Sequence, residues 1–265
     1  MGAVVGTALA LTGAGGGILA VPLLMFGLQM TLVQAAPIGL LAVGIAAATG
    51  AFLGLRDGLV RYRAAAIIGT SGMLAAPVGV HLAHTLPNAP LTIGFSLVLA
   101  WVALRSWRQA GTSTSAGLQS TSDCRICQFD TTVGRLRLNS SCVATLVCTG
   151  ALSGLLSGLL GVGGGFVIVP MMSWLSNVPA SGVVATSLAV IALVSVGGVA
   201  GALAKGGVDW AIALPFAAGA MGALIAGRQL GKGIAATKLY RAFGVTAGAV
   251  ALLLLLRGLG AWGSS

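Results

Sequence analysis

One uncharged phrase occurs twice in the chain, Gly-x-Gly-Gly-Gly followed by Val-Pro, at residues 13–22 and 161–170. Both copies lie in long apolar stretches, although glycine and proline are unfavourable inside a helix. Where a helix breaks, the next half-helix begins with unpaired backbone N–H groups and a partial positive charge. Such an N-terminus binds anions, so the chemistry predicted here is recognition of a small anion.

The residues of the two breaks have distinct expected roles. Glycine lets a ligand approach the backbone closely, and proline stiffens the first turn of the following half-helix. Pro22 and Pro170 are therefore expected to be structural, and nearby hydroxyl and amide groups to supply further donors. Close helix packing at glycine, or a hydroxyl bonded to its own helix, is the competing interpretation. The candidate substrate-binding residues are Thr12, Gly13, Gly15, Gly16, Gly17, Gln34, Gly161, Gly163, Gly164, Gly165, Thr186 and Ser187.

The acidic residues argue against a proton or sodium pump. The chain has no Glu, and its four acids, Asp57, Asp123, Asp130 and Asp209, fall in predicted loops. Pumps usually keep carboxylates inside the membrane. The sequence also shows no nucleophile triad, nucleotide-binding loop or HExxH, so neither an enzyme nor a cofactor is predicted.

Cysteines leave one alternative of another class. Cys124 and Cys127 form a CxxC pair, which in a membrane protein could serve redox chemistry or metal binding. Cys142 and Cys148 lie six positions apart in an apolar helical stretch and would not share a face. No metal site is therefore predicted. A membrane redox or metal protein that uses the CxxC pair remains as an alternative hypothesis for the function.

Composition identifies a multi-pass membrane protein. Hydrophobic residues make up 57% and charged residues 7%, and the mean hydropathy is +1.03. Residues 1–55 and 138–204 contain no Asp, Glu, Lys or Arg, whereas about 20 apolar residues span a bilayer. The net charge of +10 comes from short cationic clusters beside apolar segments. That pattern is typical of cytoplasmic loops of an inner-membrane protein rather than of a nucleic-acid-binding protein.

The chain is also duplicated. At the 148-residue offset of the two phrases, Leu40 matches Leu188 and Gly50 matches Gly198, and we expect both glycines to serve helix packing. The predicted units are a first repeat at 1–108, a hydrophilic linker with a β-hairpin at 109–137, and a second repeat at 138–265. Each repeat has about four apolar segments, at 3–30, 33–55, 64–84 and 89–108, and at 138–176, 180–204, 210–230 and 236–259.

These segments predict an all-α integral membrane fold in which the first segment of each repeat is broken. If each broken segment is a hairpin, the repeats are inverted, and the cationic loops 56–63, 105–137 and 228–241 share the inner face. If it crosses once, the halves are parallel. The positive-inside rule favours inversion. The first segment is shorter than its twin, so we expect the true start to lie upstream; the oligomeric state, including a homo-oligomer, stays open.

The residues resemble the sulfite exporter TauE/SafE family of membrane permeases. The resemblance rests on the twin glycine phrases, on Ala-Thr-Ser-Leu at 185–188, on the basic loop after the second segment and on the Cys…Thr-Val-Gly-Arg-Leu linker. It implies export or uptake of sulfite, sulfoacetate or another organosulfonate. Ile38 and Gly39 stand where the second half has Thr186 and Ser187, so the half-sites are expected to contribute unequally.

The resulting hypothesis is a secondary transporter that exports a small oxyanion such as sulfite or an organosulfonate. A negative-inside potential favours the exit of an anion by about 2.3 kcal/mol per charge per 100 mV, so no coupling carboxylate is needed. A permease for another small anion, such as a carboxylate, is the second alternative.

Overall fold

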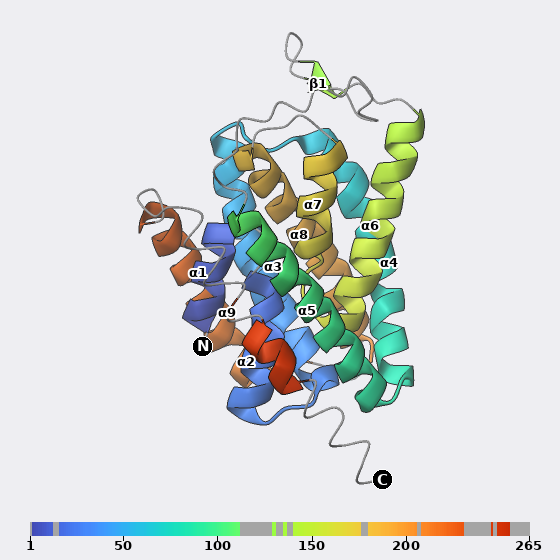
Figure 1. Cartoon of the computed structure of the whole chain (residues 1–265), viewed down its shortest axis with the longest axis vertical. Coiled ribbons are helices and arrows are strands. Elements are labelled where there is room, and N and C mark those ends of the chain that lie inside the picture. The colour runs from blue at the N-terminus through green and yellow to red at the C-terminus, as the bar shows by residue number, and fades with distance from the viewer. Residues whose placement is uncertain are drawn as a thin grey trace.

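A computed structural model describes residues 2–12, 16–111, 129–130, 135–136, 140–175, 180–205, 208–230, 245 and 248–254. This part of the chain forms a bundle of helices (Figure 1). Its elements are α1 (Gly2–Thr12), α2 (Gly16–Leu28), α3 (Leu32–Arg56), α4 (Tyr62–Thr85), α5 (Asn88–Gly111), β1 (Phe129–Asp130), β2 (Arg135–Leu136), α6 (Ser140–Leu160), α7 (Gly165–Leu175), α8 (Ala180–Leu203) and α9 (Trp210–Leu230).

Five of these helices are long and apolar enough to cross a bilayer: Leu32–Arg56, Tyr62–Thr85, Ser140–Leu160, Ser181–Leu203 and Trp210–Gly227. Their mean hydropathies lie between 1.5 and 2.3, and α2 is a shorter apolar helix. The prediction of a multi-pass helical membrane protein is confirmed. Strands β1 and β2 pair antiparallel, with Phe129 opposite Leu136, in the segment where the sequence predicts a hairpin.

Helices α3 and α8 form the centre of the bundle and run antiparallel. A Cβ atom added to Gly44 on α3 would lie 2.6 Å from the Cβ atom of Ser195 on α8. Small residues at such a crossing let two membrane helices approach closely. The absence of a side chain at Gly44 therefore sets the spacing of the central pair.

Toward the two ends of this crossing, a glycine of one helix packs against a leucine of the other, with the roles of α3 and α8 exchanged between the ends. A Cβ atom on Gly50 would lie 2.8 Å from Leu188, and one on Gly198 would press on Leu40. Both glycines thus serve helix packing, as expected. The atoms that they contact are the tips of flexible leucine side chains.

Around this pair, α4 packs against both α6 and α8 in parallel orientation. Gly72 of α4 faces Gly154 of α6. A Cβ atom added to Gly154 would lie 2.6 Å from the Gly72 Cα atom. One turn further along both helices, Gly158 packs on Ala76 and Val80. On the other side of the bundle, α1 runs parallel to α9, with Gly6 against Ala220.

These contacts fix the directions of α3, α4, α6, α8 and α9 relative to one another. Helix α3 ends at one end of the bundle, which we call the basic end because Arg56, Arg61 and Arg63 lie there. Helices α4, α6 and α8 begin at the basic end, and α9 ends there. Of the lysines and arginines whose side chains the structure describes, Lys205 lies at the opposite end. The positive-inside rule predicts that the basic end faces the cytoplasm.

The orientation gives a direct labelling prediction. In a background without the native cysteines, single cysteines at Asp57 and Arg228 should react with a membrane-impermeant thiol reagent from the cytoplasmic side only. A cysteine at Lys205 should react from the other side, because α8 crosses between them. Labelling of Asp57→Cys and Arg228→Cys from opposite sides would contradict the helix directions.

Candidate functional site

The break of the second half is built from glycines in a left-handed backbone conformation. Gly161, Gly163 and Gly164 have φ angles of +72°, +79° and +68°. L-amino acids with side chains rarely adopt this region, whereas glycine does so without steric cost. Helix α6 therefore ends, the chain reverses within four residues, and α7 begins at Gly165.

This break lies at mid-length of the central pair. A Cβ atom on Gly163 would lie 3.2 Å from Val43 of α3 and 3.0 Å from Ile191 of α8. Val43 and Ile191 are 148 positions apart, so they are corresponding residues of the two halves. The break is buried, and its surroundings come equally from both halves of the chain.

The break of the first half meets that of the second. Gly17, in the first turn of α2, faces the carbonyl group of Val162, and an added Cβ atom would lie 3.4 Å from Val43. Val43 therefore contacts both breaks. Gly13 and Gly15 lie outside the described residues, but Gly16, Gly17 and the four glycines of the second phrase are brought together.

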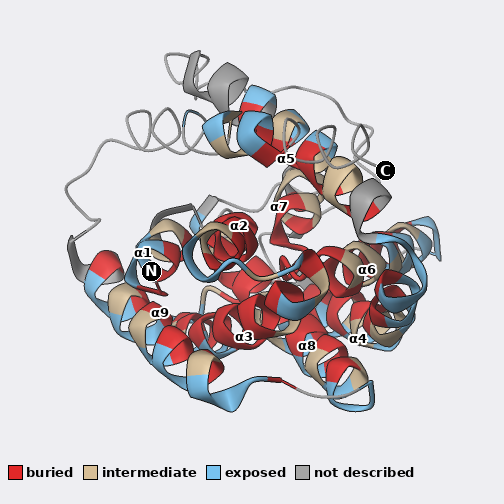
Figure 2. Ribbon diagram, turned by 90° about the horizontal axis from the view of Figure 1, so that it is seen from below, coloured by how far each residue is buried: buried red, intermediate tan, exposed pale blue. Residues whose placement is uncertain are grey.

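From this meeting point the two half-helices run apart. Helix α2 leads to the beginning of α3 at the opposite end, and α7 leads toward the beginning of α8 at the basic end. In Figure 1 α7 stands above α2 along the long axis of the bundle, and Figure 2, which looks along that axis from below, shows both within the bundle. Both N-termini thus point at one buried place, and their partial positive charges and free N–H groups suit an anion.

The same glycines are also packing residues. A Cβ atom on Gly16 would lie 2.5 Å from the Val5 carbonyl oxygen of α1, and one on Gly164 would lie 2.7 Å from the Ser153 carbonyl oxygen of α6. Each hairpin closes against backbone. The two interpretations of the glycines, ligand approach and close packing, therefore apply to the same positions.

Pro22 and Pro170 stand deeper in their helices than predicted. Pro22 is the seventh residue of α2 and Pro170 the sixth of α7, so neither lies in the first turn. Proline has no N–H group and removes the hydrogen bond to the residue four positions earlier. The carbonyl groups of Ile18 and Phe166 therefore lose that helical partner just beyond the breaks.

Thr186 has a structural role that the sequence did not indicate. Its buried hydroxyl accepts a hydrogen bond of 3.0 Å from the Arg61 backbone N–H and donates one of 2.6 Å to the Gly182 carbonyl oxygen. It ties the loop before α4 to α8 at the basic end. Ser187 is also buried, and its hydroxyl donates to the Val184 carbonyl oxygen. Unlike Thr186, it lies on the same face of α8 as Ile191, one turn away, and therefore nearer to the break.

One further candidate does not reach the break. Gln34 is exposed at the opposite end, where its Oε1 atom accepts a hydrogen bond of 3.2 Å from the Thr31 N–H. This pair forms a capping box at the start of α3. The side chain of Thr12 lies outside the described residues.

Replacing Thr186 with valine should lower the free energy of unfolding by about 1–3 kcal/mol, because the partly buried Arg61 N–H loses its acceptor. Thermal unfolding in detergent would measure the loss. Thr70→Val is the matched control, since Thr70 is exposed and bonds only within its own helix. Equal melting temperatures for the two variants would contradict the tether.

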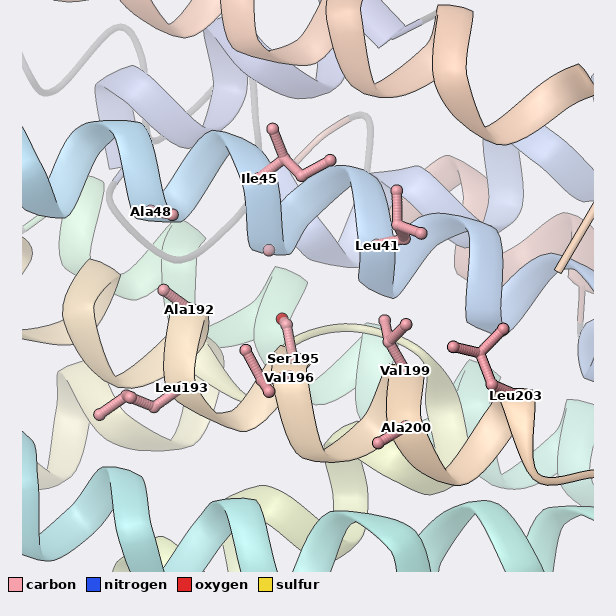
Figure 3. Close-up of a pocket in the computed structure, with 11 residues that line it drawn as sticks. Leu41, Ile45, Ala48, Ala192, Leu193, Ser195, Val196, Val199, Ala200 and Leu203 are labelled. Atoms are coloured by element: carbon pink, nitrogen blue, oxygen red, sulfur yellow. The ribbon is translucent and has the colours of Figure 1, made fainter. Parts of the chain in front are cut away.

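A cleft of about 530 Å³ lies elsewhere on the central pair (Figure 3). Its lining is apolar except for Ser195, and several of its residues, such as Ile45 and Val196, are exposed on the bundle surface. An anion in this cleft would lose its water and gain only the Ser195 hydroxyl as a donor from the lining residues, which is costly. The cleft is therefore not the anion site.

Comparisons with known proteins agree with this architecture. The sequence model of the sulfite exporter TauE/SafE family matches residues 1–254. The chain is 32% identical over 260 residues to a "Probable membrane transporter protein" of Xylella fastidiosa (strain 9a5c), covering 97% of this chain and 93% of the relative. It is 26% identical over 227 residues to "Probable membrane transporter protein YunE" of Bacillus subtilis (strain 168), covering 83% and 82%.

No solved structure is significantly similar to the chain. The family match extends over nearly every helix, including both glycine breaks, and the relatives are matched over most of their own length. The apolar helices place the protein in the membrane as a multi-pass protein. The chain belongs to the sulfite exporter TauE/SafE family of membrane transporters.

Proposed function

We propose that this protein is a secondary transporter that exports a small oxyanion such as sulfite or an organosulfonate. The observation that supports this most directly is the convergence of the α2 and α7 N-termini at mid-depth. Two half-helix dipoles aimed at one buried place favour a negative charge there. The family name points to the same class of substrate.

The arrangement of charges supports an anion rather than a cation. Residues 1–55 and 138–204, which contain both breaks, have no acidic residue. Asp57 and Asp209, the two acids with described side chains, are exposed at the helix ends. A cation at the breaks would face two positive helix ends with no carboxylate to balance its charge, whereas an anion is matched.

We also infer that residues 1–108 and 138–265 are inverted repeats joined by the linker 109–137. Corresponding helices run in opposite directions, as α3 and α8 do, and α4 begins where α9 ends. The reciprocal contacts of Gly50 with Leu188 and of Gly198 with Leu40 are what a two-fold relation predicts. Such repeats place the substrate site near mid-membrane at their interface.

The test is flux from proteoliposomes that contain the purified full chain. We expect efflux of sulfite or sulfoacetate to exceed that of acetate, and an inside-negative potential to accelerate it. For a monovalent anion, 100 mV shifts the distribution about 50-fold, since it contributes about 2.3 kcal/mol per charge. Flux of acetate alone would favour the carboxylate permease, and no flux of any of these anions would contradict the proposal.

The redox or metal alternative depends on Cys124 and Cys127, which lie outside the described residues. Cys142 is disulfide-bonded and Cys148 is a free, exposed thiol. We expect the triple variant Cys124→Ser, Cys127→Ser, Cys142→Ser to transport at the wild-type rate, because none of these residues belongs to the glycine phrases 13–22 and 161–170. Cys142 is replaced with the pair because it is disulfide-bonded. Abolished flux in a folded triple variant would favour the alternative.

A further inference from the structure

Helix α6 has three hydroxyl side chains on one face. Thr149, Ser153 and Ser157 follow at intervals of four residues and are 2%, 0% and 0% exposed. Residues four apart lie above one another on a helix. At the corresponding positions of the first half stand Met1, Val5 and Leu9, so this polar face belongs to the second half alone.

The three hydroxyls differ in their hydrogen bonds. Thr149 donates to the Thr145 carbonyl oxygen of its own helix at 2.7 Å. Ser153 donates to the Gly164 carbonyl oxygen at 3.1 Å and so joins α6 to the break. The Ser157 Oγ atom is buried and has no hydrogen-bond partner among the residues that the structure describes.

Ser157 lies beside the break. Its backbone carbonyl oxygen accepts a hydrogen bond of 2.8 Å from the Gly161 N–H, the first amide of the reversal. Its side chain shares the helix face of Ser153, which contacts Gly164 one turn away. A buried hydroxyl without a partner is unfavourable, and such groups in native proteins call for an explanation.

We propose that the Ser157 hydroxyl donates a hydrogen bond to an oxygen of the transported oxyanion. The inference rests on the proposed function and adds to it a side-chain donor from one half only. The backbone N–H groups of α2 and α7 neutralise the charge in the same way for any anion. A hydroxyl donor on one side favours an anion that offers several acceptor oxygens, as the SO₃ group of sulfite and of a sulfonate does.

Ser157→Ala should change two quantities in opposite directions. Without anion, the melting temperature of the detergent-purified chain should stay equal or rise, because an unpaired buried hydroxyl is removed. With sulfite or sulfoacetate, the thermal protection should fall, which reports weaker binding to the native state. Loss of one hydrogen bond to a charged group corresponds to at least about a tenfold higher Kd.

Ser96→Ala is the matched control. Ser96 is equally buried, on α5, and donates to the Ile93 carbonyl oxygen at 2.7 Å. Its Kd for both anions should equal that of the wild type. Ser157→Cys keeps the size of the side chain with a weaker donor, so it should raise Kd in the same direction even if the alanine variant does not fold.

The outcomes separate this inference from the proposed function. If sulfite and sulfoacetate protect the wild type and the Ser157 variants to the same extent, the inference is overturned and the transporter proposal stands. If neither anion protects the wild type and no flux is seen, the proposed function itself fails. A lower melting temperature of Ser157→Ala with an unchanged Kd would show that Ser157 serves packing only.

Discussion

Replacing Gly164 with valine is expected to abolish transport and to reduce the yield of folded protein severely. The φ angle of +68° is unfavourable for a β-branched residue, and the Cβ atom would lie 2.7 Å from the Ser153 carbonyl oxygen. Backbone strain alone costs about 1–3 kcal/mol, and the contact with α6 backbone adds to it. Flux, together with the fraction of protein that elutes as a folded species in detergent, would measure the effect.

Gly222→Val on α9 is the control for Gly164→Val. Gly222 is exposed, and an added Cβ atom would meet none of the described residues within 4 Å. We expect wild-type flux and yield from this variant. If Gly164→Val folded and transported normally, the tight reversal at the break would be dispensable.

The backbone contacts of the hairpins change what is expected of valine at Gly16 or Gly164. From the sequence alone, one extra apolar side chain costs little in lipid, so valine there would be expected to block the anion and leave insertion largely intact. Because the hairpins close against the backbone of Val5 and Ser153, valine at either position also displaces a neighbouring helix. Anion protection of these variants therefore cannot separate binding from packing, whereas Ser157→Ala can.

Gly154→Leu should separate α4 from α6 and destabilise the whole bundle. The Cβ atom would meet the Gly72 Cα atom at 2.6 Å, and no side chain is there to move aside. Overpacking costs about 1–3 kcal/mol even where side chains can adjust, so a larger loss is expected between two backbones. Thermal unfolding and size-exclusion chromatography in detergent would report it.

Gly94→Leu on α5 is the matched control, because no atom in the described part of the chain lies within 4 Å of an added Cβ atom there. It should elute and unfold like the wild type. Equal behaviour of Gly154→Leu and Gly94→Leu would mean that α4 and α6 can part without loss of the fold.

Much of the helical organisation could be predicted from the residues alone. The predicted segments 33–55 and 210–230 agree closely with α3 and α9. Long apolar runs determine these helices, since a bilayer requires about 20 such residues and forces the backbone to satisfy its own hydrogen bonds. The breaks at Gly13 and Gly161 were likewise visible, because glycine runs and proline are conspicuous in such segments.

The roles of individual side chains depended on tertiary contacts. Thr186 and Ser187 are adjacent, yet one holds the Arg61 N–H at the basic end and the other lies near the break. Gln34, a predicted ligand, caps a helix, and nothing in the sequence distinguishes Ser157 from other serines of the apolar segments. A hydroxyl or amide bonds to whatever the fold brings beside it, and its residue type does not specify that neighbour.

By itself, then, the sequence determined the membrane location, the helical segments and the two breaks, because these follow from local composition and from the solvent. Only the tertiary structure decided that the breaks meet at Val43, since that contact depends on the crossing of α3 and α8. It also decided that the two half-helices point their N-termini at one place. Glycine spacing permits such a meeting, and packing between distant segments brings it about.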